Sequence, residues 1–210
     1  MMDKIILRNL NKSFGDQRVL RDFSAELFGS GRYALMGRSG IGKTTLLRII
    51  LGLEAPDSGE LCFEMNDVPY KIRGSARKEK PSFSAVFQED RLFPGADAVS
   101  NICAVTRGLD RRRALEELSL IAPDIDPCTA ADELSGGQRR RVAVLRALLH
   151  PSDAVIMDEP FSGLDEAAKK RLIDYIDTRL DGRLLIISTH EREDALRLGC
   201  QIINLDKEQI

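Results

Sequence analysis

Cysteine is scarce in this chain of 210 residues, which contains only four. No CxxC pair and no histidine cluster occur, so the sequence has no zinc-site pattern. Reduced thiols of a cytosolic protein are the simpler interpretation. The four residues, well separated along the chain, are Cys62, Cys103, Cys128 and Cys200.

Long apolar runs are also missing. No run approaches the ~18 residues that a membrane-spanning helix needs. Residues 1–9 lack the apolar segment of a signal peptide, so we expect none. If the protein works at a membrane, we expect another chain to cross the bilayer.

An excess of positive charge is absent as well. The formal net charge of −2 disfavours a globally basic nucleic-acid binder. Two arginine runs, at residues 111–113 and 139–141, are predicted to be solvated helix faces rather than binding patches. With 43% hydrophobic and 30% charged residues, the composition is that of one globular domain, with room for a small inserted lobe.

Apolar patterns predict an α/β fold. Partial alternation at residues 4–8, 19–28 and 59–68 predicts an antiparallel sheet. Short apolar runs at 33–36, 83–87, 154–157 and 184–187 have the length of buried parallel strands, and 201–205 supplies a last strand. Helical patterns cover 42–51, 111–121, 137–149 and 166–180. This alternation predicts a doubly wound core, and residues 88–134 indicate a helical insertion.

A G-x-x-x-x-G-K-[ST] pattern lies between the predicted strand 33–36 and the helix 42–51. Its glycines let backbone N–H groups wrap around phosphate. Lys43 can reach the β- and γ-phosphates, and Thr44 offers a hydroxyl to Mg²⁺. The alternative is a glycine-rich turn, but the strand–loop–helix context favours a phosphate loop. The expected ATP-binding residues here are Gly37, Arg38, Ser39, Gly40, Ile41, Gly42, Lys43, Thr44 and Thr45.

An acidic pair follows the apolar run at residues 154–157. Asp158 and Glu159 would lie at the carboxyl edge of the sheet, where open α/β sheets bind ligands. We expect Asp158 to help hold Mg²⁺, directly or through water. Glu159 is expected to orient and polarise the attacking water. The alternative is a solvated turn, which the intact phosphate loop disfavours.

The sequence Leu134-Ser135-Gly136-Gly137-Gln138 precedes an amphipathic helix. Two glycines at a helix start forgo roughly 1 kcal/mol each of helix propensity. We therefore expect something to approach this backbone closely, and the bare N–H groups suit an anion.

At this point the chain resembles the ABC ATPases, whose signature is LSGGQ. The resemblance extends from Phe14 to the final strand, with motif order and spacing in agreement. It implies a P-loop NTPase (RecA-like) core with an antiparallel β subdomain and a short inserted helical subdomain. The chain would be a single ABC ATPase domain, residues 1–210, with the insertion at approximately 89–135.

The resemblance also implies a dimer. In that family the signature binds the γ-phosphate of an ATP held by the phosphate loop of the other subunit. This chain has one loop and one signature, so it must pair as a homodimer or with a second ABC ATPase. The signature residues expected to bind the nucleotide are Ser135, Gly136, Gly137 and Gln138.

Four further positions match the family. Phe14 would stack on adenine, although in isolation it would be interpreted as a core residue. Gln88 would touch Mg²⁺ or the attacking water and sense the transmembrane partner. Asp165 would cross to the opposite subunit, and it is also a helix N-cap candidate. His190 would contact the γ-phosphate; the alternative is that Thr189 caps a helix that His190 opens.

The implied catalytic set is thus Glu159, His190 and Gln88, and the implied Mg²⁺ ligands are Thr44, Gln88 and Asp158. Residues 85–94 resemble importer ATPases for nitrate, sulfonates and related solutes, whereas Gly95-Ala96 replaces a tryptophan that many of them have. The solute subclass therefore stays open.

We expect a peripheral ATPase on the cytoplasmic face of the cell membrane, bound to integral membrane permease subunits. A solute-binding protein is a further candidate partner, and no nucleic acid is expected. The short stretch after His190 predicts no C-terminal regulatory domain. The alternative is a soluble ABC ATPase acting on nucleic acid or ribosomes. The short insertion, too short for a coiled-coil arm, and the single ATPase domain disfavour it.

Overall fold

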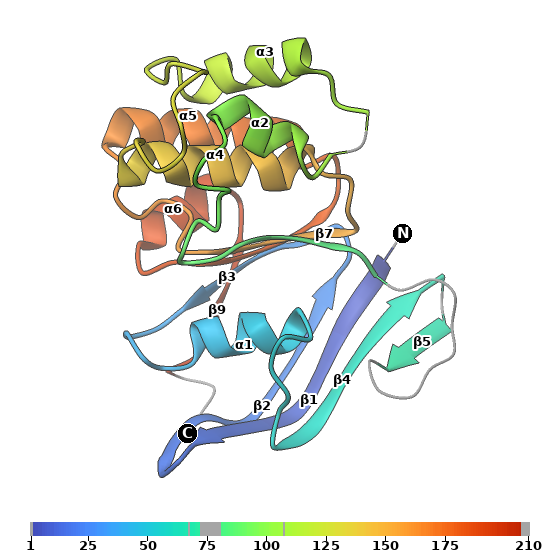
Figure 1. Cartoon of the computed structure of the whole chain (residues 1–210). Coiled ribbons are helices and arrows are strands. Elements are labelled where there is room, and N and C mark those ends of the chain that lie inside the picture. Colours follow the sequence, from blue (N-terminus) through green and yellow to red (C-terminus); the bar gives the residue numbers. More distant parts are fainter. Residues whose placement is uncertain (1, 67, 72–80, 107, 207–210) are drawn as a thin grey trace. The chain divides into compact units, whose positions relative to one another are not determined.

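The alternating apolar residues near the N-terminus form an antiparallel sheet (Figure 1). The computed structural model describes residues 2–66, 68–71, 81–106 and 108–206. The strand order in this sheet is β2-β1-β4-β5. Its strands are β1 (Met2–Phe14), β2 (Gln17–Phe28), β4 (Ser58–Met65) and β5 (Val68–Lys71).

Strand β1 is longer than the predicted strand at residues 4–8. Its pairing with β2 shifts register between Leu7 and Leu10 and again between Leu10 and Lys12. At the first shift Asn9 has a φ of 48°, and the Ser24 hydroxyl accepts a hydrogen bond from its backbone N–H at 2.9 Å. These bulges break the two-residue alternation, which is why the pattern ended early in the sequence.

A second, parallel sheet forms from the short apolar runs. Four of its strands follow one another in the order β7-β8-β3-β9. Every residue of β7 and β8 is buried, as expected for strands covered on both faces. Their bounds are β3 (Arg32–Met36), β7 (Ala154–Asp158), β8 (Leu184–Ser188) and β9 (Gln201–Asn204).

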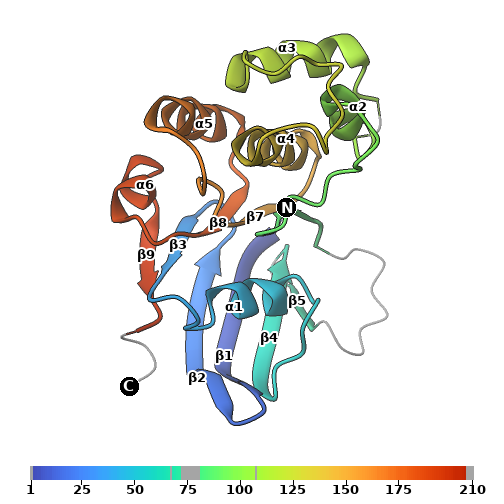
Figure 2. The same ribbon diagram turned by 60° about the vertical axis from the view of Figure 1, so that its left-hand side comes forward.

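The antiparallel sheet and these four parallel strands belong to one compact unit, made of residues 1–83, 152–158 and 182–210. Helix α1 (Lys43–Ile50) lies against β1, β2 and β4 (Figure 2), and α6 (Arg192–Arg197) packs on β3 and β9. One hydrophobic core joins both sheets to α1. Its members include Leu7, Phe23, Leu46, Ile50, Phe63, Ile156 and Ile186.

The second compact unit comprises residues 84–151 and 159–181. Its helices are α2 (Ala98–Cys103), α3 (Arg111–Ile121), α4 (Gly136–Leu149) and α5 (Glu166–Arg179). The buried carboxylate of Glu117 joins α3 to α5, because Tyr175 and Arg179 each donate a 2.6 Å hydrogen bond to it. Strand β6 (Phe83–Val86) begins in the first unit and continues into the second.

The predicted strands and helices are confirmed, with a large change of boundary at β1 and smaller changes elsewhere. The predicted strand at 59–68 is divided between β4 and β5, and its residue 67 lies outside the described residues. Helices α2 and α3 fall within the predicted insertion, whose boundaries at 89–135 stay a prediction.

The prediction for the arginine run 139–141 was wrong. Arg140 and Arg141 are 6% and 5% exposed, whereas the run 111–113 is solvated as predicted. Arg140 donates to the carbonyls of Phe87 and Gln88 at 2.6 Å each, and Arg141 forms a two-bond pair with Asp124. The charge pattern of a sequence does not show whether an arginine is paired inside the protein or exposed to solvent.

None of the helices in the described part of the chain has the length and hydrophobicity required to traverse a bilayer.

We predict that Phe63→Ala lowers the free energy of unfolding by about 3–5 kcal/mol, because it opens a cavity in the core. Phe63 is fully buried, and its ring centroid lies 5.5 Å from that of Phe83. Urea titration measures the loss. The control is Phe28→Ala, where the ring is 57% exposed and a change within about 0.5 kcal/mol is expected. Equal losses in the two variants would contradict this assignment of the core.

Candidate nucleotide site

The phosphate-loop segment connects β3 to α1, as its pattern predicted. Gly42 is the N-cap of α1 with a φ of 113°, and a Cβ there would lie 2.6 Å from the Val19 carbonyl oxygen. Both the left-handed backbone and the close approach to β2 require glycine. The loop is thereby fixed against the sheet at the point where α1 begins, and the first N–H groups of a helix have no partner within the helix itself.

Lys43 is the first residue of α1 and is 9% exposed. Its Nζ donates to the carbonyl of Gly37 at 2.8 Å and to that of Arg38 at 3.3 Å. The ammonium group therefore lies within the loop that the preceding residues form. This placement suits a cation that neutralises phosphate held by the same loop.

The ends of β7 and β8 and the start of α1 bring oxygen ligands together. The register pairs Ser188 of β8 with Asp158 of β7 on one side and with Leu35 of β3 on the other. The Asp158 carboxylate is 5% exposed, and it accepts hydrogen bonds from the Thr44 hydroxyl at 2.7 Å and from the Ser188 hydroxyl. Hydroxyl and carboxylate oxygens are the hard donors that Mg²⁺ prefers, so Thr44 and Asp158 fit the ion.

Phe14 ends β1 with its ring 51% exposed, so it is not a core residue. An exposed aromatic ring can stack on a base, as the resemblance predicted.

His190 follows β8, and its side chain is 66% exposed. The hydroxyl of Thr189 accepts a hydrogen bond from the backbone N–H of Glu191 at 3.1 Å, and α6 begins only at Arg192. The alternative in which Thr189 caps a helix opened by His190 is therefore wrong.

Glu159 and Gln88 belong to the second unit. Glu159 has a φ of 50°, a left-handed conformation that costs a non-glycine residue of order 1 kcal/mol and is concentrated at functional sites. Gln88 follows β6, and its backbone carbonyl accepts the hydrogen bond from Arg140.

The signature residues form the start of α4. Ser135 accepts a hydrogen bond from the backbone N–H of Gln138 at 3.2 Å, and Gln138 Oε1 accepts one from the backbone N–H of Ser135 at 2.9 Å. This capping box gives both residues a structural role. Asp124 accepts a hydrogen bond from the Gln138 side chain at 3.3 Å and pairs with Arg141, which lowers the pKa of Asp124.

The two signature glycines differ in their surroundings. A Cβ on Gly137 would lie 2.9 Å from the carbonyl oxygen of Gly163, whereas a Cβ on Gly136 meets nothing within 4 Å. Gly137 is thus explained by close packing on the loop before α5. Only Gly136 leaves open space for something to approach from outside.

One pocket of about 610 Å³ brings the signature and the loop before α5 together. Ser135, Gly136 and Gly137 line it, together with Asp165. Asp165 is the N-cap of α5, and its carboxylate accepts a hydrogen bond from the backbone N–H of Ala168 at 2.7 Å. The N-cap alternative is confirmed, and it leaves the crossing role of Asp165 as a prediction.

Sequence reasoning missed three side chains. Ser188 contacts Asp158, Asp124 contacts the signature helix, and the Asp206 carboxylate accepts a hydrogen bond from the backbone N–H of Arg38 at 3.1 Å. Only Ser188 could have been found from the sequence. It directly follows the apolar run 184–187, at the edge of the sheet that also holds Asp158.

Comparisons with known proteins identify the family and the fold. A family model described as "ABC transporter" matches residues 20–162. The chain is 34% identical over 213 residues to the aliphatic sulfonates import ATP-binding protein SsuB 1 of Rhizobium johnstonii, a match that covers 98% of this chain and 74% of that protein.

It is also 34% identical over 215 residues to the sulfate/thiosulfate import ATP-binding protein CysA of Pectobacterium atrosepticum. That match covers 97% of this chain but only 64% of the relative's length. Among solved structures, a dimeric post-hydrolysis state of the ATP-binding cassette MJ0796, bound to ADP and Pi, superposes with a TM-score of 0.78 at 26% identity. The superposition covers 95% of this chain and 93% of that one.

We predict that Gly137→Ala lowers the free energy of unfolding by about 1–3 kcal/mol, because the added methyl group overlaps the Gly163 carbonyl. Gly136→Ala is the matched control, with open space around the new methyl group and a helix propensity gain of up to about 1 kcal/mol. Thermal unfolding of both variants measures the difference. A Gly136→Ala variant less stable than Gly137→Ala would contradict the packing described here.

Proposed function

Because the chain belongs to the ABC transporter family and is an ATP-binding, ATP-hydrolysing subunit of importer type, we propose that it drives solute import through separate membrane permease subunits. ATP binding and hydrolysis at a dimer interface would supply the energy. The subunit would lie on the cytoplasmic face of the membrane, held there by the permease, with a solute-binding protein delivering the solute.

The observation that supports the dimer is the distribution of the two motifs. Each chain has one phosphate loop, in the first compact unit, and one signature, in the second. In the proposed dimer the signature of each subunit meets the ATP on the partner's loop, so two chains complete two sites. A homodimer is the simplest such pair, and the ATP-binding cassette MJ0796 forms a dimer in its solved structure.

For the nucleotide, we propose that Phe14 stacks on adenine and that the loop of residues 37–45 holds the phosphates. Lys43 then exchanges its carbonyl partners for the β- and γ-phosphates. Thr44, Asp158 and Gln88 would hold Mg²⁺, which would neutralise negative charge on the phosphates.

For hydrolysis, we propose that Glu159 orients the attacking water and accepts its proton. His190 contacts the γ-phosphate, and its exposed ring is accessible for this role. Gln88 approaches the water or the metal and reports the state of the permease. Its backbone is bound to α4 through Arg140, so movement of this loop is linked to the signature helix.

On the partner's nucleotide, we propose that Ser135, Gly136, Gly137 and Gln138 bind the γ-phosphate through the start of α4. Open space beside Gly136 supports this direction of approach. Asp165 lines the same pocket and contacts the opposite subunit.

We predict that Ser135→Arg leaves ATP binding by the isolated subunit nearly intact and abolishes hydrolysis. The signature serves the partner's nucleotide, and a bulky cation at this helix start prevents the dimer from closing. Equilibrium titration with ATP and a phosphate-release assay measure the two properties. Parallel loss of binding and hydrolysis would contradict a site shared between subunits.

The test of the catalytic assignment is Glu159→Gln. Glutamine keeps the shape of the side chain but is a poor proton acceptor, so we expect hydrolysis to fall by about 10²–10⁴-fold. ATP binding should survive, because Lys43, Thr44 and Asp158 remain. The variant should elute as a monomer without nucleotide and as a dimer with ATP, since hydrolysis no longer opens the dimer.

The control is the unchanged protein with ADP, which should elute as a monomer. Hydrolysis at the normal rate in Glu159→Gln would remove Glu159 from the catalytic role. ATP binding without dimerisation would overturn the proposed dimer mechanism for the isolated subunit.

A further inference from the structure

Lys12 is a nearly buried lysine in β1, with 9% of its surface exposed. Its ammonium group has three oxygen partners on one short segment. They are Glu54 Oε1 at 2.7 Å, the Ala55 carbonyl at 2.9 Å and Asp57 Oδ1 at 3.4 Å. The hydrogen bond with Glu54 raises the pKa of Lys12, so the side chain is charged.

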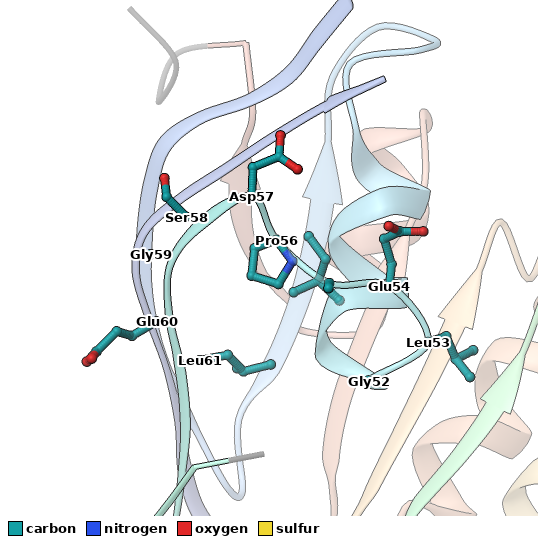
Figure 3. A pocket seen from close by; sticks show the side chains of 11 residues that line it. Gly52, Leu53, Glu54, Pro56, Asp57, Ser58, Gly59, Glu60 and Leu61 are labelled. Carbon is teal, nitrogen blue, oxygen red and sulfur yellow. The ribbon is translucent and has the colours of Figure 1, made fainter. Parts of the chain in front are cut away.

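The partners lie on the loop that joins α1 to β4. This loop and the start of β4, together residues 52–61, line a pocket of about 550 Å³ (Figure 3). Glu54 lies at its end near α1 and Asp57 at its end near β4. The backbone N–H groups of Leu53 and Glu54 both donate to the Arg48 carbonyl, at 2.9 and 3.2 Å, so the loop is fastened to α1.

The same loop is fastened to the segment just before Phe14. Asp57 Oδ2 accepts a hydrogen bond from the backbone N–H of Ser13 at 2.7 Å, and the backbone N–H of Asp57 donates to the Asn11 carbonyl at 2.8 Å. Helix α1 begins at Lys43, in the phosphate loop. A continuous series of contacts therefore runs from the phosphate loop along α1 to the end of β1.

Lys12 extends this series to the aromatic ring. Its Nζ lies 5.0 Å from the centroid of the Phe14 ring, within the range of a cation–π interaction. Phe14 is half exposed, so the contact with Lys12 limits the positions of a ring that would otherwise move freely.

We propose that Lys12 is a positioning residue for the base of the nucleotide. It holds the Phe14 ring where the ring stacks on adenine, and through Glu54 and Asp57 it fixes that place relative to the phosphate loop. This inference rests on the proposed function, in which Phe14 binds the base. Lys12 should therefore affect only the binding of ligands that have a base. The contacts of Lys12 described above do not include the phosphate-binding residues.

The experiment compares ATP with inorganic tripolyphosphate, which has the phosphates but no base. Lys12→Met keeps an unbranched side chain only one heavy atom shorter and removes its charge. We expect the dissociation constant for ATP, measured by equilibrium titration without hydrolysis, to rise about 3- to 10-fold, the size of a lost cation–π contact and of part of a stacking contact. Binding of tripolyphosphate should stay unchanged.

Two controls separate positioning from general damage. Lys12→Arg keeps the charge and should restore most of the affinity for ATP. Lys4→Met removes another lysine of β1, one that pairs with Glu64 at 3.3 Å, and should change neither ligand. If Lys12→Met does not fold, Glu54→Gln weakens the same cluster and should show the same selective loss for ATP.

A double-mutant comparison shows whether Lys12 acts through the ring. Phe14→Ala should weaken ATP binding, and adding Lys12→Met to it should cause no further loss. Equal losses for ATP and tripolyphosphate, or additive losses in the double variant, would overturn the inference. If Phe14→Ala weakens ATP binding but Lys12→Met does not, only the inference fails. If Phe14→Ala has no effect, the proposed base contact fails, and the inference fails with it.

Discussion

The parallel pairing of β3, β8 and β7 is the constraint on which the candidate site depends. Because the strands are parallel, their carboxyl ends meet at one edge of the sheet. The register places Ser188 beside both Leu35 and Asp158. The loop that follows β3 therefore starts next to the acidic end of β7, and the Thr44 hydroxyl reaches the Asp158 carboxylate. Residues separated by more than a hundred positions become neighbours through backbone hydrogen bonds alone.

The sequence was most informative where a residue's role depends on its neighbours in the chain. The apolar runs of β7 and β8 and the glycine spacing before Lys43 predicted strands, loop and helix, because periodicity and local conformation set these features. Long-range partners were not predictable in this way. The burial of Arg140 and Arg141 depends on carbonyls and carboxylates elsewhere in the second unit, and the contact of Asp206 with Arg38 joins residues 168 positions apart. The bulges around Asn9 likewise interrupt the alternation of β1, so the part of the strand after residue 8 was not predicted.

The signature illustrates how a binding motif and a local structural motif share residues. Ser135 and Gln138 complete a capping box, so they stabilise the helix whether or not they contact a ligand. Of the two glycines, Gly136 has open space where a Cβ would lie, and the approach of another group to this backbone stays a prediction. Gly137 is needed for internal packing, because a Cβ there would overlap the carbonyl of Gly163. The family motif thus contains residues that the fold requires and one glycine beside open space. The sequence alone does not show which residue has which role.

The close approach of Gly137 to Gly163 has a mechanical consequence. The start of α4 and the loop that ends at Asp165 pack closely here, because a Cβ on Gly137 would lie 2.9 Å from the Gly163 carbonyl oxygen and 3.2 Å from the Leu164 side chain. Because close-packed protein interiors have low compressibility and transmit strain, we expect a displacement of either segment to move the other with it.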